Sequence, residues 1–187
     1  MRIITGAAKG VKLLTLEGLE TRPTAERTKE AVFSTLQFDI EGRKVLDLFS
    51  GSGQMALEAL SRGADLAVML DKSKDAIGVI KKNAEKTRLA PKCEIYCTDC
   101  FDYLSRNKGK KFDLVFIDPP YALKLVGKVL TALLEADALK PTSIVVCESA
   151  EPDVLGGDSL LENSFEILKS GKYGVAYVNI LTLKGGI

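Results

Sequence analysis

The stretch Val45-Leu46-Asp47-Leu48-Phe49-Ser50-Gly51-Ser52-Gly53 decides the fold of this chain of 187 residues. Its first half, Val45 to Phe49, is a short apolar run that predicts a buried strand. Its two glycines predict a sharp turn where a ligand can approach the backbone, and Gln54 to Arg62 predicts the helix that follows. Only a Gly-x-Gly is present, because Ala56 stands at the third glycine position of a dinucleotide-binding loop. A tight turn that needs glycine only for packing is therefore an open alternative.

Beyond this stretch, apolar runs alternate with helical patterns, which is typical of a mostly parallel sheet covered by helices on both faces. The expected strands are 45–49, 66–70, 94–97, 112–117 and 143–147, and the expected helices are 54–62, 73–88, 101–107 and 123–135. Near the end, 165–173 and 175–183 predict two strands joined by a turn, so the final strand is antiparallel. Residues 153–159, with two glycines, predict a loop. The prediction is an α/β fold with a doubly wound, Rossmann-like sheet.

Residues 1–43 lack the alternation of strand and helix patterns that marks residues 44–187, and we expect them to form a separate extension of the main domain. Two short strand-like runs, 2–5 and 11–14, predict a small β-hairpin. A hairpin alone is marginally stable, so it must lean on the main domain or on a partner. Pro23, with Thr24 as the N-cap, predicts a helix that runs to about residue 36.

The extension carries an excess of positive charge. Residues 1–29 hold six Lys or Arg against three Glu, although the whole chain carries a net charge of only +1. A locally positive surface of this kind can contact phosphate. A solvated helix face has the same composition and is the alternative.

Composition excludes several classes of protein. The chain is 46% hydrophobic, as in globular proteins, and no apolar run approaches the roughly 18 to 20 residues that span a bilayer. The start, Met1-Arg2-Ile3-Ile4, lacks the long apolar core of a signal peptide, so we expect a cytoplasmic protein without a membrane partner. The chain contains no histidine, which excludes Ser-His and Cys-His mechanisms. Its chemistry must need little acid-base help.

Three of the four cysteines, Cys93, Cys97 and Cys100, lie close together in the sequence. Their spacing, the distance to Cys147 and the lack of histidine match neither common zinc pattern. We therefore expect reduced thiols and no metal.

Acidic residues follow the expected strands. Asp71 stands 20 positions after Gly51, where a carboxylate can accept hydrogen bonds from both hydroxyls of a bound ribose. Asp99 follows the next strand and could receive an adenine amino group. For both residues, capping of the helix that follows is the alternative.

The tetrapeptide Asp118-Pro119-Pro120-Tyr121 follows the apolar run 112–117, at the edge of the sheet where open α/β folds bind ligands. Its two prolines have no N–H donor, so the Asp118 carboxylate and the backbone carbonyls form a stiff cluster of acceptors beside an aromatic ring. Acceptors and a stacking ring suit a planar amino group. The alternative is a rigid turn that ends in a packed tyrosine.

In this order along the chain, the glycine loop, the ribose acid, the third-strand acid and Asp-Pro-Pro-Tyr resemble the class I S-adenosylmethionine-dependent methyltransferases. Residues 118–121 match the N/D-P-P-Y/F signature of enzymes that methylate exocyclic amino nitrogens of nucleic-acid bases. The resemblance implies a seven-stranded methyltransferase sheet, S-adenosyl-L-methionine as cofactor and S-adenosyl-L-homocysteine as product. Methyl transfer from an activated sulfonium also fits a chain without histidine.

More narrowly, the chain resembles the RsmD family of bacterial 16S rRNA (guanine-N(2)-)-methyltransferases over nearly its whole length. The matching segments are Met1-Arg2-Ile3-Ile4-x-Gly6, Lys9-Gly10, Thr21-Arg22-Pro23-Thr24 with Arg27 and Glu30, Val45 to Gly53, Glu58 to Ala64, Asp71-Lys72-Ser73 and Lys172-Tyr173-Gly174. Thr21 to Thr24 is the most specific of them. The chain departs from the family at Gln54-Met55-Ala56 and in the loop 151–163.

The resemblance implies a role for each candidate residue. The catalytic candidates are Asp118, Pro119, Pro120 and Tyr121. The cofactor-binding candidates are Asp47, Phe49, Ser50, Gly51, Ser52, Gly53, Asp71, Lys72, Asp99 and Cys100. The candidates for RNA contact are Lys9, Lys12, Arg22, Thr24 and Arg27. The implied partner is ribosomal RNA within a partly or fully assembled small subunit.

Two other functions are open at this point. A DNA adenine methyltransferase shares the Asp-Pro-Pro-Tyr chemistry, but no segment outside the core exceeds about 43 residues, which is small for target recognition on DNA. A non-catalytic RNA-binding assembly factor could keep the same fold. The sequence does not identify the modified nucleotide, the state of the RNA substrate or the oligomeric state.

Overall fold

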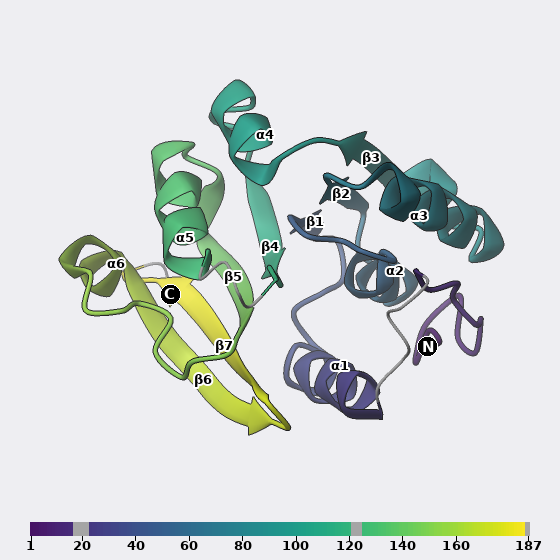
Figure 1. Cartoon of the computed structure of the whole chain (residues 1–187), viewed down its shortest axis with the longest axis horizontal. Coiled ribbons are helices and arrows are strands. Elements are labelled where there is room, and N and C mark those ends of the chain that lie inside the picture. The colour runs from purple at the N-terminus through teal and green to yellow at the C-terminus, as the bar shows by residue number, and fades with distance from the viewer. Residues whose placement is uncertain (17–22, 121–124, 186–187) are drawn as a thin grey trace. The chain divides into compact units, whose positions relative to one another are not determined.

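The computed structural model describes residues 1–16, 23–120 and 125–185 (Figure 1). The chain divides into two compact units, Met1–Asp99 and Cys100–Ile187. Each unit contains part of a β-sheet and the helices that cover it.

The first unit contains three parallel strands in the order β3-β2-β1. Its elements are α1 (Pro23–Thr35), β1 (Lys44–Asp47), α2 (Gln54–Ser61), β2 (Leu66–Asp71), α3 (Lys74–Lys86), a 3-10 turn η1 (Ala90–Lys92) and β3 (Cys93–Cys97). Residues 67–70 of β2 are fully buried, and α2 and α3 both pack against this strand. Burial on both faces explains why the strand is a continuous apolar run rather than an alternating one.

The second unit contains four strands in the order β4-β5-β7-β6. Its elements are α4 (Cys100–Arg106), β4 (Phe112–Ile117), α5 (Val126–Glu135), β5 (Leu139–Ser149), α6 (Ser159–Ser164), β6 (Phe165–Tyr173) and β7 (Ala176–Leu183). Strand β4 is parallel to β5, whereas β7 is antiparallel to both β5 and β6. Figure 1 shows α5 and α6 side by side, next to these strands.

The strand order of the whole chain is β3-β2-β1-β4-β5-β7-β6. The predicted seven-stranded, mostly parallel sheet with an antiparallel C-terminal strand is therefore confirmed. The predicted hairpin at the start of the chain reduces to a single antiparallel bridge between Arg2 and Lys12.

Differences from the prediction include the start of α1, the start of α5 and the presence of α6. Helix α1 begins at Pro23, so Thr24 lies inside the first turn and is not the N-cap; a proline at the first helical position is favourable because its missing N–H has no intrahelical partner. Helix α5 begins at Val126, and the first residues of the predicted helix fall partly on 121–124, outside the described residues. Helix α6 was not predicted, because the two glycines before it indicated only a loop.

Candidate functional site

The loop between β1 and α2 is a tight turn that both of its glycines require. Gly51 and Gly53 have φ values of +54° and +77°, which favour glycine over any other residue. A Cβ atom at Gly53 would lie 3.3 Å from the Met69 sulfur, so this position is also fixed by packing. A Cβ atom at Gly51 would meet nothing within 4 Å. The loop therefore has open space at Gly51, where a ligand can approach the backbone.

Asp47 lies beneath this loop, at the end of β1, and exposes only 3% of its surface. Burial raises the pKa of its carboxyl to about 7. Its Oδ2 atom has no hydrogen-bond partner among the described residues. A buried carboxylate with an unsatisfied oxygen is suited to a ligand that brings a positive charge or an N–H donor.

We expect Asp47 to make stability depend on pH. Its pKa is 3.8 ordinarily and about 7 in the fold, so its contribution to stability is complete below pH 4 and is lost as the pH rises to 7 and above. The variant Asp47→Asn, which stays neutral, should gain stability relative to the parent across this window. Urea unfolding of both proteins between pH 4 and pH 8 measures the difference, and a difference that does not change with pH contradicts the prediction.

Asp71, at the end of β2, joins the glycine loop to the start of α3. Its Oδ2 atom accepts a hydrogen bond from the Gly51 N–H at 2.9 Å, and its Oδ1 atom accepts one from the Ser73 N–H at 2.8 Å. The N-cap of α3 is Ser73, whose side chain accepts from the Ala76 N–H. Asp71 thus fixes the loop backbone, a role that the sequence did not predict.

The other cofactor candidates fall in both units. Lys72 and Asp99 are brought together in the first unit, where Lys72 Nζ lies 2.5 Å from Asp99 Oδ2. Phe49 is half-buried beside the loop. Cys100, the first residue of α4 in the second unit, is buried.

The catalytic candidates follow β4 in the second unit. Asp118 is exposed, Pro119 is buried and Pro120 is exposed. Ile117, the last residue of β4, is paired with Cys147 of β5, so Asp118 follows the carboxyl end of β4 beside β5. Tyr121 lies outside the described residues.

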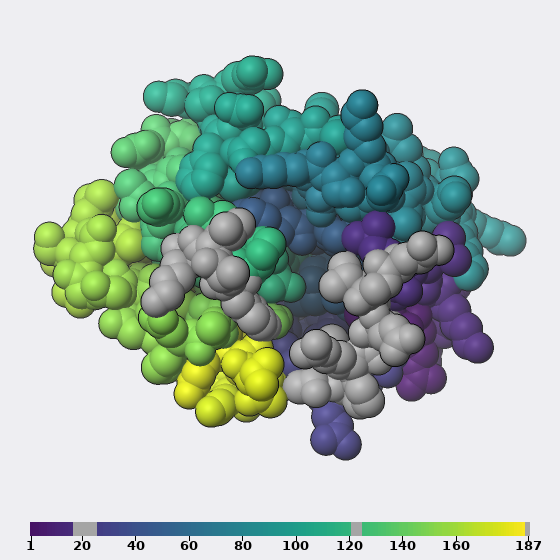
Figure 2. Space-filling model, viewed as in Figure 1, coloured from purple at the N-terminus to yellow at the C-terminus, as the bar shows by residue number. Residues whose placement is uncertain are grey.

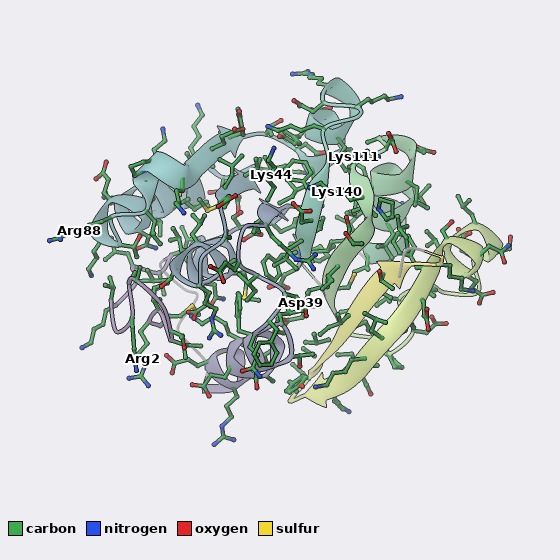
Figure 3. All side chains as sticks on the ribbon, turned by 180° about the vertical axis from the view of Figure 1, so that it is seen from behind. Arg2, Asp39, Lys44, Arg88, Lys111 and Lys140 are labelled. Atoms are coloured by element: carbon green, nitrogen blue, oxygen red, sulfur yellow. The ribbon has the colours of Figure 1, made fainter. Side chains whose placement is uncertain are left out.

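Of the RNA candidates, Lys9, Lys12 and Arg27 have exposed side chains. Arg22 and the side chain of Thr24 lie outside the described residues. The sequence did not single out Arg2, whose side chain is 62% exposed and extends outward (Figure 3).

A buried ion cluster anchors the N-terminal segment to α2. The side chains of Lys29 and Glu58 are both 0% exposed, and Lys29 Nζ lies 3.4 Å from Glu58 Oε2. Burial lowers the pKa of Lys29, although Glu58 opposes this shift. Arg62 Nε donates to Glu58 Oε1 at 2.8 Å. Lys29, one of the six positive residues of 1–29, is therefore structural and not available to RNA.

Backbone groups of the N-terminal segment complete the contact with α2. The Ile4 and Thr5 N–H groups donate to the Glu58 carboxylate at 2.7 and 3.0 Å. Gly6 lies against Ser61 so closely that an added Cβ atom would be 1.7 Å from the Ser61 carbonyl oxygen. The expected hairpin thus leans on the main domain through residues of α2.

Asn83 of α3 joins the N-terminal segment to the glycine loop. Its Oδ1 atom accepts from the Leu14 N–H at 2.8 Å. Its Nδ2 atom donates to the Leu14 carbonyl at 3.0 Å and to the Ser52 carbonyl at 2.9 Å. The side chain is fully buried, so one amide fixes both segments.

The cysteines do not form a metal site within the described ranges, where no group of three or more ligand residues could hold an ion. Cys97 is exposed, whereas burial raises the pKa of the Cys93 thiol to about 12. None of the helices in the described part of the chain is long and apolar enough to cross a membrane.

A family model described as conserved hypothetical protein 95 matches residues 1–182. The chain belongs to this family. It is the RsmD family, and the Ribosomal RNA small subunit methyltransferase D of Haemophilus influenzae is 31% identical over 177 residues, or 94% of this chain and 90% of that protein. The protein of the same name from Escherichia coli K12 is 31% identical and covers 80% of this chain and 74% of its own length.

Solved structures agree with membership of the RsmD family. The Escherichia coli protein yhhF has a TM-score of 0.85 at 25% identity, over 98% of this chain and 97% of that chain. A Thermus thermophilus protein, TTHA0928, has a TM-score of 0.78 at 25% identity, over 98% and 99%. The likeness extends over both units.

For this member of the RsmD family, the sequence contained signals for two structural residues, Glu58 and Asn83, that were not recognised from it. Glu58 is a charged residue inside the apolar run Ala56 to Leu60, where a solvated side chain is not expected. Asn83 lies on the apolar face of α3, three positions after Ile80. A polar residue at a core position needs a buried partner, and this rule could have identified both.

Proposed function

We propose that this protein transfers a methyl group from S-adenosylmethionine to the exocyclic N(2) amino group of a guanine in small-subunit ribosomal RNA. The observation that carries the proposal is Asp118-Pro119-Pro120 at the carboxyl end of β4, in a chain of the RsmD family. Family membership supports the reaction class and the rRNA substrate, and the acceptor motif supports an amino nitrogen as target.

The first unit fits the cofactor. The open space at Gly51 and the unsatisfied Oδ2 atom of Asp47 suit a ligand with positive charge. In the proposal the Asp71 carboxylate holds the ribose hydroxyls, and Asp99, paired with Lys72, lies at the adenine end. When bound, the sulfonium supplies an activated methyl group, so the protein mainly has to position the two reactants.

The second unit supplies the acceptors for the target base. The lone pair of a guanine amino nitrogen is delocalised into the ring, which makes it a poor nucleophile. Hydrogen bonds from this amino group to the Asp118 carboxylate and the Pro119 carbonyl aim the lone pair at the methyl group and stabilise the positive charge that develops. Tyr121 stacks on the base, which must first leave its own stack.

Asp71→Ala should weaken the binding of S-adenosylhomocysteine by at least about tenfold, because a charge-assisted hydrogen bond to ribose is worth roughly 1.5 to 3 kcal/mol. Calorimetric titration gives the dissociation constant. Since Asp71 also holds the Gly51 N–H, thermal unfolding without ligand serves as the control for damage to the loop. An unchanged dissociation constant removes Asp71 from the site.

Residues 1–43 are proposed as the RNA-contacting extension. The triple variant Lys9→Gln, Lys12→Gln, Arg27→Gln should weaken RNA binding and flatten its dependence on salt, since each lost phosphate contact lowers the slope by about 0.7 to 0.9. Affinity measured from 50 to 300 mM KCl gives this slope. The triple variant Lys81→Gln, Lys82→Gln, Lys86→Gln removes the same charge from exposed positions on α3 and is the control. Equal salt dependence of RNA affinity in the parent and in the first variant would show that Lys9, Lys12 and Arg27 form a solvated face that does not contact RNA.

One experiment tests the proposed function. Small-subunit rRNA from cells that lack this protein is offered both naked and within small subunits, with duplex DNA in parallel, and methylated nucleosides are identified by mass spectrometry. The expected product is N(2)-methylguanosine at one position of the rRNA. Methyladenine in DNA would support the DNA enzyme, and failure to bind S-adenosylmethionine would support a non-catalytic assembly factor.

A further inference from the structure

The second unit contains a cavity of about 350 Å³ directly beside the proposed catalytic motif. Pro119 and Pro120 form one wall, and the start of α5 and the loop 150–158 form the others. In Figure 2 the atoms of this loop and of α6, in yellow-green, lie at the surface. The lining includes Leu125, Val126, Val154 and Leu155, which provide apolar contact area for a planar ring.

Glu148, which also lines this cavity, lies at the same level of the sheet as Asp118. Ile117 is paired in parallel with Cys147, and the next residues on the two strands are Asp118 and Glu148. A residue that precedes proline is held in an extended conformation, so Asp118 continues the direction of β4. Neighbouring strands are about 4.8 Å apart, and laterally paired residues face the same side of a sheet. Asp118 and Glu148 therefore follow paired residues at this edge of the sheet.

Two aspartates that also line the cavity, Asp153 and Asp158, hold their own backbone. Asp153 Oδ1 accepts from the Leu155 and Gly156 N–H groups at 3.0 and 2.9 Å. Asp158 caps α6 by accepting from the Leu160 and Leu161 N–H groups. Glu148 belongs to β5 rather than to this loop, and it lies next to the proposed catalytic motif. Its position suits ligand recognition rather than loop structure.

We propose that the Glu148 carboxylate accepts the N1–H of the target guanine and so determines the base that is methylated; this inference rests on the proposed function. The Watson–Crick edge of guanine presents the N1–H beside the N(2) amino group. With that amino group held by Asp118 and the Pro119 carbonyl, the adjacent N1–H falls to the next acceptor along the edge of the sheet.

The same geometry discriminates against other ligands. The N1 atom of adenine carries no hydrogen and is itself an acceptor. It therefore cannot form a hydrogen bond with the Glu148 carboxylate. A phosphate would be repelled by the acidic residues that line the cavity. Among the described lining residues, Lys128 is the one basic residue. Guanine has the donors that this edge of the sheet requires.

The test uses 2-aminopurine, which keeps the 2-amino group but has an unprotonated N1. Once the methylated guanosine is mapped, small-subunit rRNA is prepared by ligation with either guanosine or 2-aminopurine riboside at that position. The parent should methylate the guanosine RNA at least about tenfold faster, because a carboxylate left facing an acceptor loses a charged hydrogen bond. In Glu148→Gln this preference should fall to within about threefold, since the amide can donate to N1 of 2-aminopurine.

Glu162→Gln, the same change at an exposed position on α6, is the control and should keep the preference of the parent. Thermal unfolding and the affinity for S-adenosylhomocysteine show whether Glu148→Gln is folded. A folded Glu148→Gln that keeps the full preference for guanosine overturns the inference and leaves the proposed function intact. Absence of N(2)-methylguanosine from the reaction of the parent overturns the proposed function itself.

Discussion

Replacement of Asp118 by alanine should reduce methyl transfer to rRNA by at least about a hundredfold, the loss typical of removing one preorganised group that stabilises transition-state charge. Positive charge develops on the amino nitrogen as it attacks the methyl group, and the Asp118 carboxylate is the acceptor proposed to stabilise it. Cofactor binding should be nearly unchanged, because Asp118 is not among the residues proposed to hold the cofactor. Transfer of a tritiated methyl group measures the first effect, and calorimetry with S-adenosylhomocysteine measures the second.

Asp118→Asn provides the matched control for this prediction. Asparagine keeps an acceptor oxygen in a side chain of the same shape, so this variant should retain more activity than Asp118→Ala. A loss of S-adenosylhomocysteine affinity in the alanine variant would indicate a structural role. Turnover by Asp118→Ala at the rate of the parent would show that the tetrapeptide is only a rigid turn.

Glu58→Gln should lower the free energy of unfolding by about 3 to 5 kcal/mol, because it leaves the buried Lys29 ammonium without its counter-charge. This is a large part of the roughly 5 to 15 kcal/mol that stabilises a typical domain. The change also weakens the acceptor that holds the Ile4 and Thr5 N–H groups, so the N-terminal segment should lose protection from hydrogen exchange. Urea unfolding and exchange measured by mass spectrometry give the two effects.

An exposed ion pair of the same unit provides the comparison. The Asp39 Oδ1 atom lies 3.4 Å from the Arg43 Nη2 atom, and the Asp39 side chain, labelled in Figure 3, is 48% exposed. Asp39→Asn should change stability by less than about 1 kcal/mol, as for other surface pairs. The double variant Lys29→Met with Glu58→Gln should lose less stability than the sum of the two single variants. Each single variant leaves one buried charge of this pair without its partner, whereas the double variant removes both charges. Additive losses would show that the two charges act independently.

Much of the sheet could be predicted because its strands carry local signals. The run 112–117 is apolar except for Asp113, and β4 has the predicted bounds, Phe112–Ile117. Helix α6, Ser159–Ser164, was missed because six residues are too few to show a helical period and because Gly156 and Gly157 precede it. A short helix is specified by its packing rather than by its own sequence.

The candidate site could be predicted to a lesser extent. The spacing of Asp71 from Gly51 identified a carboxylate that does lie at the glycine loop, although its contact there is with the loop backbone. The contacts of Glu58 and Asn83 and the proposed role of Glu148 could not be predicted, because each depends on a partner or a neighbour that is remote in sequence. Asn83, for example, binds Leu14, which is 69 positions away.

The distance in sequence between the N-terminal segment and its anchors has a consequence during protein synthesis. Ile4 binds a residue 54 positions later, and Leu14 binds one 69 positions later. Chains grow at about 5 to 20 residues per second, so Leu14 waits roughly 3 to 14 seconds on the ribosome before Asn83 has been made. The segment made first is thus fixed only after Glu58 and Asn83 have been made, late in the synthesis of its unit.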